Sequence, residues 1–200
     1  INSDYHEASV AITDDGKTLY FTRDNVNKRN RIDYDKKGTS YLKIYKATLI
    51  NGKWSNIEDL PFNDDVFSTG HPALSVDNKT LYFVSDREGG LGQTDIYSVA
   101  INTDGTYGSP KNMGKSINTE GRENFPFISQ KGTLYFSSNG HLGLGGLDVF
   151  KVDNMNAANK VIYNVGKPIN SPKDDFAYMI NETTLKGFVS SNHAGGKGDD

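Results

Sequence analysis

A 19-residue segment that recurs along the chain constrains the fold more than any other feature. The clearest copy, residues 79–97, reads KTLYFVSDREGGLGQTDIY, and residues 132–150 repeat it as GTLYFSSNGHLGLGGLDVF. Partial copies occur at residues 17–24 together with 43–45, and at residues 186–200. The chain therefore consists of four related units.

The spacing of these units predicts the fold class. The aromatic residues Phe21, Phe83, Phe136 and Phe188 hold the same position in each copy and follow one another at 62, 53 and 52 residues. A repeat of roughly 40–50 residues that is rich in strand formers and turns is typical of a β-propeller, whose blades are four-stranded sheets. We therefore predict an all-β propeller. The predicted blade units are residues 1–63, 64–118, 119–170 and 171–200.

The second unit shows the expected order of strands most clearly. The predicted strands are His71–Val76, Thr80–Ser85, Thr94–Ile101 and Gly108–Met113. In the second of them Leu81 and Phe83 face one side of the sheet while Tyr82 and Val84 face the other. Both faces are apolar, as expected for a blade between two neighbours. The alternative is an ordinary β-sandwich with a chance resemblance between its strands.

The fourth unit is predicted to be truncated. In the second and third units the Asp or Asn after the strand is followed nine residues later by an Asp, as in Asp86 and Asp95 or Asn139 and Asp148. In the fourth unit the corresponding position, nine residues after Asn192, would lie one position past Asp200. The last blade would then stop before its third strand and leave open strand edges, which propellers normally close. We therefore expect a parent protein with six or more blades and further domains flanking this segment.

Composition excludes several classes of function. The net charge of −3 gives no electrostatic reason to expect nucleic acid or an anionic membrane surface as partner. No apolar run reaches the roughly 18 residues that a transmembrane helix needs, so no transmembrane segment is predicted. Cysteine is absent, which excludes disulfides, thiolate metal sites and a cysteine nucleophile.

The first unit carries a long insertion between Asp24 and Lys43. Residues 25–40, which we call the basic excursion, hold five cationic and two anionic residues in an otherwise acidic chain. Long loops on rigid scaffolds often carry recognition, here of a protein partner or a lipid headgroup. The alternative is a solvated loop. The predicted partner-binding residues are Lys28, Arg29, Arg31, Tyr34, Lys36 and Lys37.

The glycine-rich loop of the repeat has two interpretations. Its flanking oxygens could bind Ca²⁺, which needs six to eight oxygen ligands, but each loop offers only two such side chains. Alternatively, glycine supplies positive φ angles while Asp or Asn caps backbone N–H groups. We favour the second interpretation and predict no metal and no other cofactor. The calcium candidates are Asp86, Asp95, Asn139 and Asp148.

Acidic residues at the starts of the inner strands suggest a glycosidase as an alternative function. Two facing carboxylates could act as acid and nucleophile or base, and the candidates are Glu7, Glu120, Glu123, Asp174 and Asp175. The second unit, however, has Thr69-Gly-His71 at this place. The four histidines also hold different repeat positions, so they predict no shared metal site. We therefore predict that the protein is not an enzyme; the alternative is a carbohydrate-binding or carbohydrate-cleaving propeller that uses channel carboxylates such as Glu7 and Glu123.

Three segments carry a resemblance to a known family. Residues 15–23, 79–97 and 190–200 resemble the TolB-type, WD40-like propeller repeat. The Gly-Gly-x-Gly loop and the sequence SINTEG at 116–121 resemble the propeller domains of OmpA-family envelope proteins of Bacteroidota, among which is the peptidoglycan-binding accessory protein of the type 9 secretion system. The first unit departs from this pattern because it lacks the Gly-Gly loop.

The resemblance implies an exported periplasmic protein that is associated with the outer membrane. In that family the propeller usually lies between a helical-repeat region and an OmpA-like domain that binds peptidoglycan, and neither is present in these residues. We therefore expect a non-catalytic scaffold that binds protein partners in the cell envelope through its loops. Peptidoglycan would be reached only through a domain outside this chain.

Overall fold

The computed structural model describes residues 5–27, 29, 31–155, 157 and 159–193, and these contain strands and turns but no helix. None of the described segments is therefore a helix that could cross a membrane. Strand-forming Tyr, Phe, Val and Ile alternate with turn residues throughout the repeat, and this pattern favours sheets.

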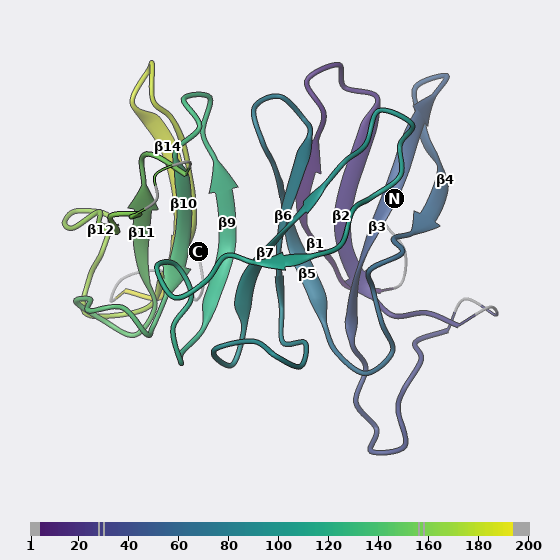
Figure 1. The fold of residues 1–200 in the computed structure, drawn as a ribbon, viewed down its shortest axis with the longest axis horizontal. Helices are drawn as coiled ribbons and strands as arrows, with labels where there is room; N and C mark the ends of the chain where they lie inside the picture. The colour runs from purple at the N-terminus through teal and green to yellow at the C-terminus, as the bar shows by residue number, and fades with distance from the viewer. Residues whose placement is uncertain (1–4, 28, 30, 156, 158, 194–200) are drawn as a thin grey trace. The chain divides into compact units, whose positions relative to one another are not determined.

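The first two sheets each have four strands joined in sequence order (Figure 1). The first contains β1 (Glu7–Ile12), β2 (Thr18–Asp24), β3 (Leu42–Ile50) and β4 (Lys53–Asp59), all antiparallel. The second contains β5 (Thr69–Leu74), β6 (Thr80–Ser85), β7 (Asp95–Ala100) and β8 (Lys111–Asn112). Three of the four strands predicted for this unit are close to the observed ones. The fourth is only two residues long, and it begins directly after Pro110, which cannot donate a ladder hydrogen bond.

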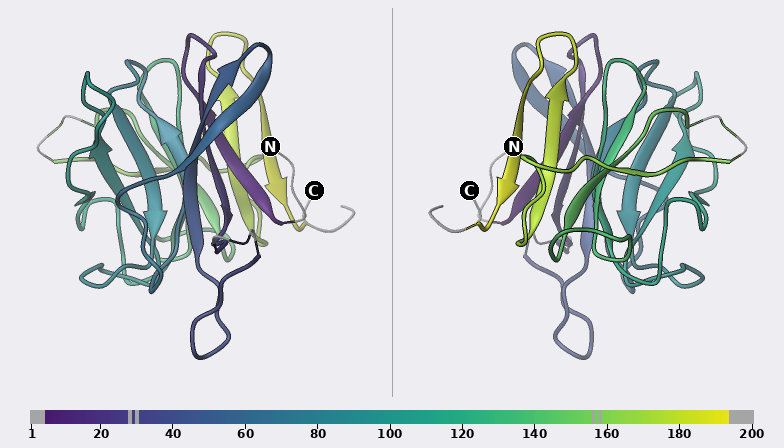
Figure 2. Two further views of the ribbon diagram at one scale, coloured as in Figure 1. Left: turned by 90° about the vertical axis from the view of Figure 1, so that its right-hand side faces the viewer. Right: turned by 90° about the vertical axis from the view of Figure 1, so that its left-hand side faces the viewer.

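The third sheet repeats this arrangement and the fourth has two strands among the described residues. The third contains β9 (Glu123–Ile128), β10 (Leu134–Ser138), β11 (Asp148–Val152) and β12 (Tyr163–Asn164). The fourth contains β13 (Asp175–Asn181) and β14 (Lys186–Ser191), drawn in yellow in Figure 2. A third strand of this sheet would fall on or after residues 194–200, which lie outside the described residues.

The residues form two compact units, 1–89 with 97–111 and 90–96 with 112–200. In the first unit one core cluster consists of eight buried side chains from the first two sheets and the crossing between them. These are Tyr20, Ile44, Leu60, Phe62, Leu81, Phe83, Tyr97 and Val99. A second cluster of the first unit contains Leu19, Phe21, Tyr45 and Ala47. In the second unit the buried residues Tyr135, Val149 and Tyr178 form the corresponding core between the third and fourth sheets.

The first strand of every sheet contains a β-bulge. One non-glycine residue at each bulge has a positive φ, namely Ser9 (42°), His71 (53°), Phe125 (52°) and Ala177 (52°). The strand register shifts around each of these residues. A bulge bends and twists its strand, so the same bend recurs in all four sheets. The left-handed conformation is unfavourable for these residue types, and the surrounding sheet must enforce it.

Candidate functional site

The basic excursion joins β2 to β3 and extends beyond the ends of both strands (Figures 1 and 2). Its two limbs are tied together by backbone contacts. The Asn25 N–H donates to the Tyr41 carbonyl at 3.0 Å, and Val26 forms an antiparallel bridge with Ile32. The excursion is therefore a structured protrusion rather than an unpaired loop.

Two side chains shape the turns of the excursion. Asn27 accepts hydrogen bonds from the backbone N–H groups of Arg29 and Arg31, at 2.9 and 3.3 Å. Asp35 accepts from the N–H groups of Lys37 and Thr39, both at 2.8 Å. The Thr39 bond is the largest of the causes that lower the pKa of Asp35. Such local side-chain bonds preform turns, so the backbone at Arg29, Arg31 and Lys37 is held at defined places.

The predicted binding residues that the structure describes are all exposed. They are Arg29, Arg31, Tyr34, Lys36 and Lys37, and Tyr34 is 58% exposed. Within the described ranges, none of the ion pairs involves the four cations among them. Lys28 lies outside the described residues. A role for these residues in binding stays a prediction.

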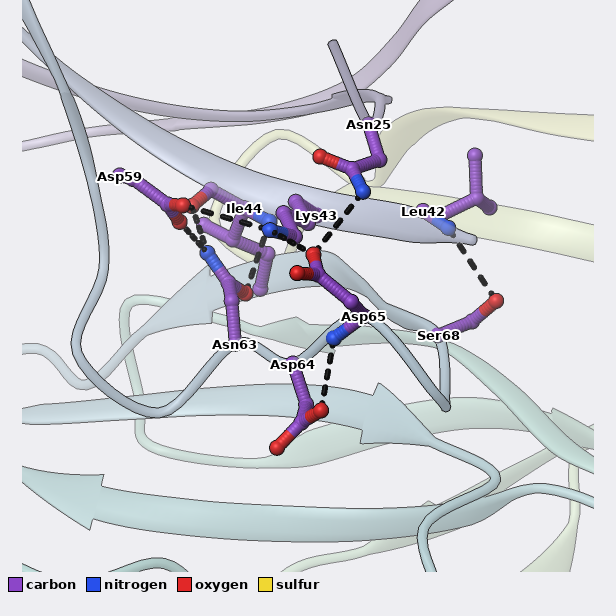
Figure 3. Close-up of polar contacts among 9 residues, drawn as sticks. All are labelled: Asn25, Leu42, Lys43, Ile44, Asp59, Asn63, Asp64, Asp65 and Ser68. Carbon is purple, nitrogen blue, oxygen red and sulfur yellow. Dashed lines mark hydrogen bonds and ion pairs between the residues drawn. The ribbon is translucent and has the colours of Figure 1, made fainter. Parts of the chain in front are cut away.

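A buried lysine anchors the base of the excursion (Figure 3). Lys43 is 7% exposed, and its Nζ lies 2.6 Å from an oxygen of Asp65 and 3.4 Å from one of Asp59. Asn25, at the other limb, donates to the same Asp65 oxygen at 3.0 Å. The Leu42 N–H donates to the Ser68 hydroxyl at 3.2 Å. Both limbs are thus fixed to the segment that crosses from the first sheet to the second.

Electrostatics agree with this geometry. The hydrogen bond from Lys43 is the main cause that lowers the pKa of Asp65. Burial by itself lowers the pKa of Lys43, but the hydrogen bond that Lys43 donates to Asp65 and the charges of Asp59 and Asp65 outweigh it, so the pKa is raised. Lys43 therefore stays charged and paired over the physiological range.

An asparagine in each crossing holds the neighbouring sheet, and sequence reasoning missed this role. Asn63 accepts from the Ile44 N–H at 3.1 Å and donates to the Ile44 carbonyl at 2.7 Å. Asn118 makes the same two bonds to Ile96, and Asn170 makes them to a valine of β11. An apolar residue followed by Asn recurs at 62–63, 117–118 and 169–170. That recurrence was the available signal.

The four calcium candidates all accept backbone hydrogen bonds, two of them from their own glycine-rich loop and two from residues just before an inner strand. Asp95 accepts from the Leu91 and Gly92 N–H groups, and Asp148 from the Leu144 and Gly145 N–H groups. Asp86 and Asn139 likewise accept from the Ser68 and Arg122 N–H groups, at 2.6 and 2.7 Å. Among the described residues no three His, Cys, Asp or Glu side chains are grouped as metal ligands would be. These contacts support the capping interpretation of the loop.

The glycines of these loops serve close packing more than turn geometry. In the first loop Gly89 alone has a positive φ, at 84°. A Cβ at Gly92 would clash with the carbonyl oxygens of Thr119 and Gly121, and one at Gly145 would clash with the carbonyl of Lys173. The expectation that glycine mainly supplies positive φ is therefore wrong for most of the loop. Here glycine lets another backbone segment approach.

Three of the five carboxylates considered for the glycosidase alternative accept backbone hydrogen bonds within the second unit. Glu123 is completely buried and accepts from the Thr119 N–H, the Thr119 hydroxyl and the Ser138 hydroxyl at 2.7–2.8 Å. Asp174 accepts from the Leu147 N–H, and Asp175 from a backbone N–H in the preceding crossing. Glu123 therefore offers no exposed oxygen to a sugar.

Two of the histidines have hydrogen-bond partners on other elements of their own unit. His71 Nδ1 lies 2.8 Å from the Ser9 hydroxyl, and burial lowers the pKa of His71 to about 4. His141 Nε2 lies 2.8 Å from the Ile117 carbonyl. Each side chain thus links elements within its own unit.

The sequence matches no family model and no curated protein. Among solved structures, this chain is similar to a puromycin-hydrolyzing peptidase of Mycobacterium tuberculosis, with a TM-score of 0.58 and 12% identity over 94% of this chain and 28% of that one. A putative TolB from Agrobacterium tumefaciens matches with a TM-score of 0.56 and 14% identity over 98% of this chain and 73% of that one. The fold is a β-propeller.

These matches confirm the predicted fold class. A third, the α-L-arabinofuranosidase of Lactobacillus brevis, has a TM-score of 0.51 and 14% identity over 95% of this chain and 66% of that one. At such identities the similarity establishes the fold alone. The chain spans little more than a quarter of the length of the puromycin-hydrolyzing peptidase.

The prediction that the protein is not an enzyme is wrong as drawn from the sequence. Structures that share this fold include a puromycin-hydrolyzing peptidase and an α-L-arabinofuranosidase. The repeat pattern reports how blades pack, whereas catalysis depends on particular side chains placed on that scaffold. A regular repeat without a familiar motif therefore does not exclude catalysis.

Proposed function

We propose that this propeller binds an acidic protein partner in the bacterial cell envelope through the basic excursion. One observation carries the proposal: the cationic side chains are exposed on preformed turns and are not neutralised by ion pairs within the described part of the chain. Preorganised loops lose less entropy on binding. Complementary charge steers association and selects the partner.

The base of the excursion supports the same proposal. Lys43 and Asp65 tie the base of the excursion to the body of the first unit, so the excursion keeps a fixed position relative to the first sheet. Tyr34 adds an exposed ring beside the charges, and tyrosine and arginine are enriched among residues that dominate binding energy.

The resemblance of the repeat supports an envelope location. We propose a periplasmic protein associated with the outer membrane, in which the blade units 1–63, 64–118, 119–170 and 171–200 belong to one propeller with further domains outside this chain. A part in type 9 secretion or envelope assembly follows from the same resemblance. Contact with peptidoglycan would belong to one of those further domains.

A charge-reversal experiment tests the proposal. The full-length protein is solubilised from the envelope with a gentle detergent and its partners are recovered by pull-down. The test variant carries Arg29→Glu, Arg31→Glu, Lys36→Glu and Lys37→Glu. The control carries the same charge change at four other exposed lysines: Lys53→Glu, Lys79→Glu, Lys111→Glu and Lys131→Glu.

We expect the test variant to lose the partner and the control to keep it. Binding of the wild type should also weaken as ionic strength rises, because exposed charges are screened. Recovery of the same partners with both variants would show that binding lies elsewhere on the protein.

A further inference from the structure

A cavity of about 400 Å³ lies within the second unit, beside the outer strands of the third sheet and next to β13. Its size falls within the range of ordinary small-molecule sites, roughly 300–1,000 Å³. The residues that give it its chemistry are Tyr135, Lys151, Asp153, Tyr163, Asn164 and Tyr178. None of them belongs to the basic excursion.

Tyrosine rings form the base and the rim of this cavity. Tyr135 and Tyr178 are 7% and 9% exposed and pack edge to face, with ring centroids 5.3 Å apart. Tyr163, on β12, is 48% exposed and stands at the rim. An exposed tyrosine combines an apolar face with a polar tip. It therefore suits a ligand that is itself apolar on one face and hydroxylated at its edge.

A charged pair beside Tyr163 provides donors and acceptors at the same place. Lys151 Nζ lies 3.0 Å from both carboxylate oxygens of Asp153 and 5.7 Å from the centroid of the Tyr163 ring. The pair has no net charge, so it does not favour an ionic ligand. Such a pair can bind two neighbouring hydroxyl groups: the ammonium donates a hydrogen bond to one hydroxyl, and the carboxylate accepts one from the other.

The base of the cavity is held in a fixed orientation. Tyr135 donates its hydroxyl proton to Glu182 at 3.0 Å, and the Ser129 hydroxyl donates to the other Glu182 oxygen at 2.7 Å. The hydroxyl proton of Tyr135 is therefore not available to a ligand, and the Tyr135 oxygen can only accept a hydrogen bond. Asn164 is fixed as well, because its side-chain oxygen accepts from the Gly166 N–H at 2.8 Å.

We propose that this cavity binds a neutral saccharide. The sugar ring stacks on Tyr163, and its neighbouring hydroxyls bind Lys151 and Asp153. This inference is independent of the protein-binding function proposed for the excursion, and it involves none of the channel carboxylates considered from the sequence.

Calorimetric titration of the full chain with three neutral disaccharides tests the inference. The probes are N,N′-diacetylchitobiose, maltose and xylobiose, with trialanine as a peptide probe. Two variants remove the proposed contacts, Tyr163→Ala and Asp153→Ala, and both change exposed residues. Tyr34→Ala is the matched control, because it removes an exposed tyrosine from the excursion.

We expect at least one disaccharide to bind. Tyr163→Ala should weaken it by about three- to tenfold through loss of stacking, and Asp153→Ala by about tenfold or more through loss of a charged hydrogen bond. Tyr34→Ala should leave the affinity for the disaccharide unchanged. Failure of all three disaccharides, binding of trialanine alone, or equal affinity in wild type and both cavity variants would each overturn the inference. Circular dichroism of each variant separates lost binding from lost folding.

Discussion

Replacement of the crossing asparagine Asn118 by alanine should cost the second unit about 3 kcal/mol of stability. Asn118 is 2% exposed; it accepts from the Ile96 N–H at 2.8 Å and donates to the Ile96 carbonyl at 2.9 Å. The Met113 N–H also donates to that carbonyl, at 3.0 Å, so the carbonyl keeps a partner in the variant. The Ile96 N–H does not, and a buried donor without a partner costs about 1–3 kcal/mol.

The remaining loss comes from the hydrogen bonds that disappear. Asn118 also donates to the Asn112 side chain at 2.9 Å. Each hydrogen bond lost adds about 0.5–1.5 kcal/mol. Asn170→Ala should behave alike, since Asn170 is 1% exposed and makes the equivalent bonds. Asn63 is only half-buried, so water can replace its amide, and Asn63→Ala should cost about 1–2 kcal/mol.

Urea unfolding measures these differences. Far-UV circular dichroism follows the whole chain, and fluorescence of Trp54, the only tryptophan, reports on the first unit. Asn102→Ala is the control, because Asn102 is an exposed turn residue bonded to Thr106, and its removal should change stability by no more than about 0.5 kcal/mol. The slope of free energy against urea must stay constant for the comparison to hold.

The reasoning would be refuted if Asn118→Ala and Asn170→Ala each cost less than about 1 kcal/mol, or no more than Asn102→Ala. Such a result would mean that the crossings are held by apolar packing alone. If Asn63→Ala lost as much stability as the variants of the two buried asparagines, burial of the amide would not determine the loss of stability.

Three further predictions concern pH, close packing and the contacts of a guanidinium group. As pH falls from about 6.5 to about 4, the unfolded chain binds a proton that folded His71 does not, so the free energy of unfolding of wild type should fall by about 3 kcal/mol. Urea titrations at several pH values should show a smaller fall for His71→Asn, which has no imidazole. Asn is the chosen replacement because it tolerates the positive φ at this position. Gly92→Ala should cost about 1–3 kcal/mol because its Cβ meets backbone, whereas Gly108→Ala, with ordinary contacts of 3.5 Å and beyond, should be nearly neutral in thermal melts. Arg87→Lys should lower the melting temperature by several degrees, because lysine cannot keep the hydrogen bonds to the Phe62 carbonyl and the Ser85 hydroxyl together with the three ring contacts.

The candidate site was only partly visible in the sequence. The excess of cationic residues in 25–40 marked the excursion, because a loop that breaks a regular repeat is visible without a structure. The anchor at its base was not visible, since Lys43 and Asp65 are 22 residues apart and meet only through the crossing. The saccharide cavity was also invisible, because Tyr163 is a partly exposed residue on a two-residue strand.

The sequence by itself determined the repeat, the all-β class and the order of strands in each sheet. These follow from alternation and turn residues, which act within a few positions of one another. Only the tertiary structure decided which polar residues became structural. Glu123 was a candidate only in the alternative glycosidase hypothesis, and the structure encloses it between Thr119 and Ser138. Asp95 was a calcium candidate, and in the structure its carboxylate accepts hydrogen bonds from backbone N–H groups of its own loop. Whether a carboxylate faces solvent or backbone depends on segments that are distant in the chain and meet only when the sheets pack, and no local pattern records that encounter.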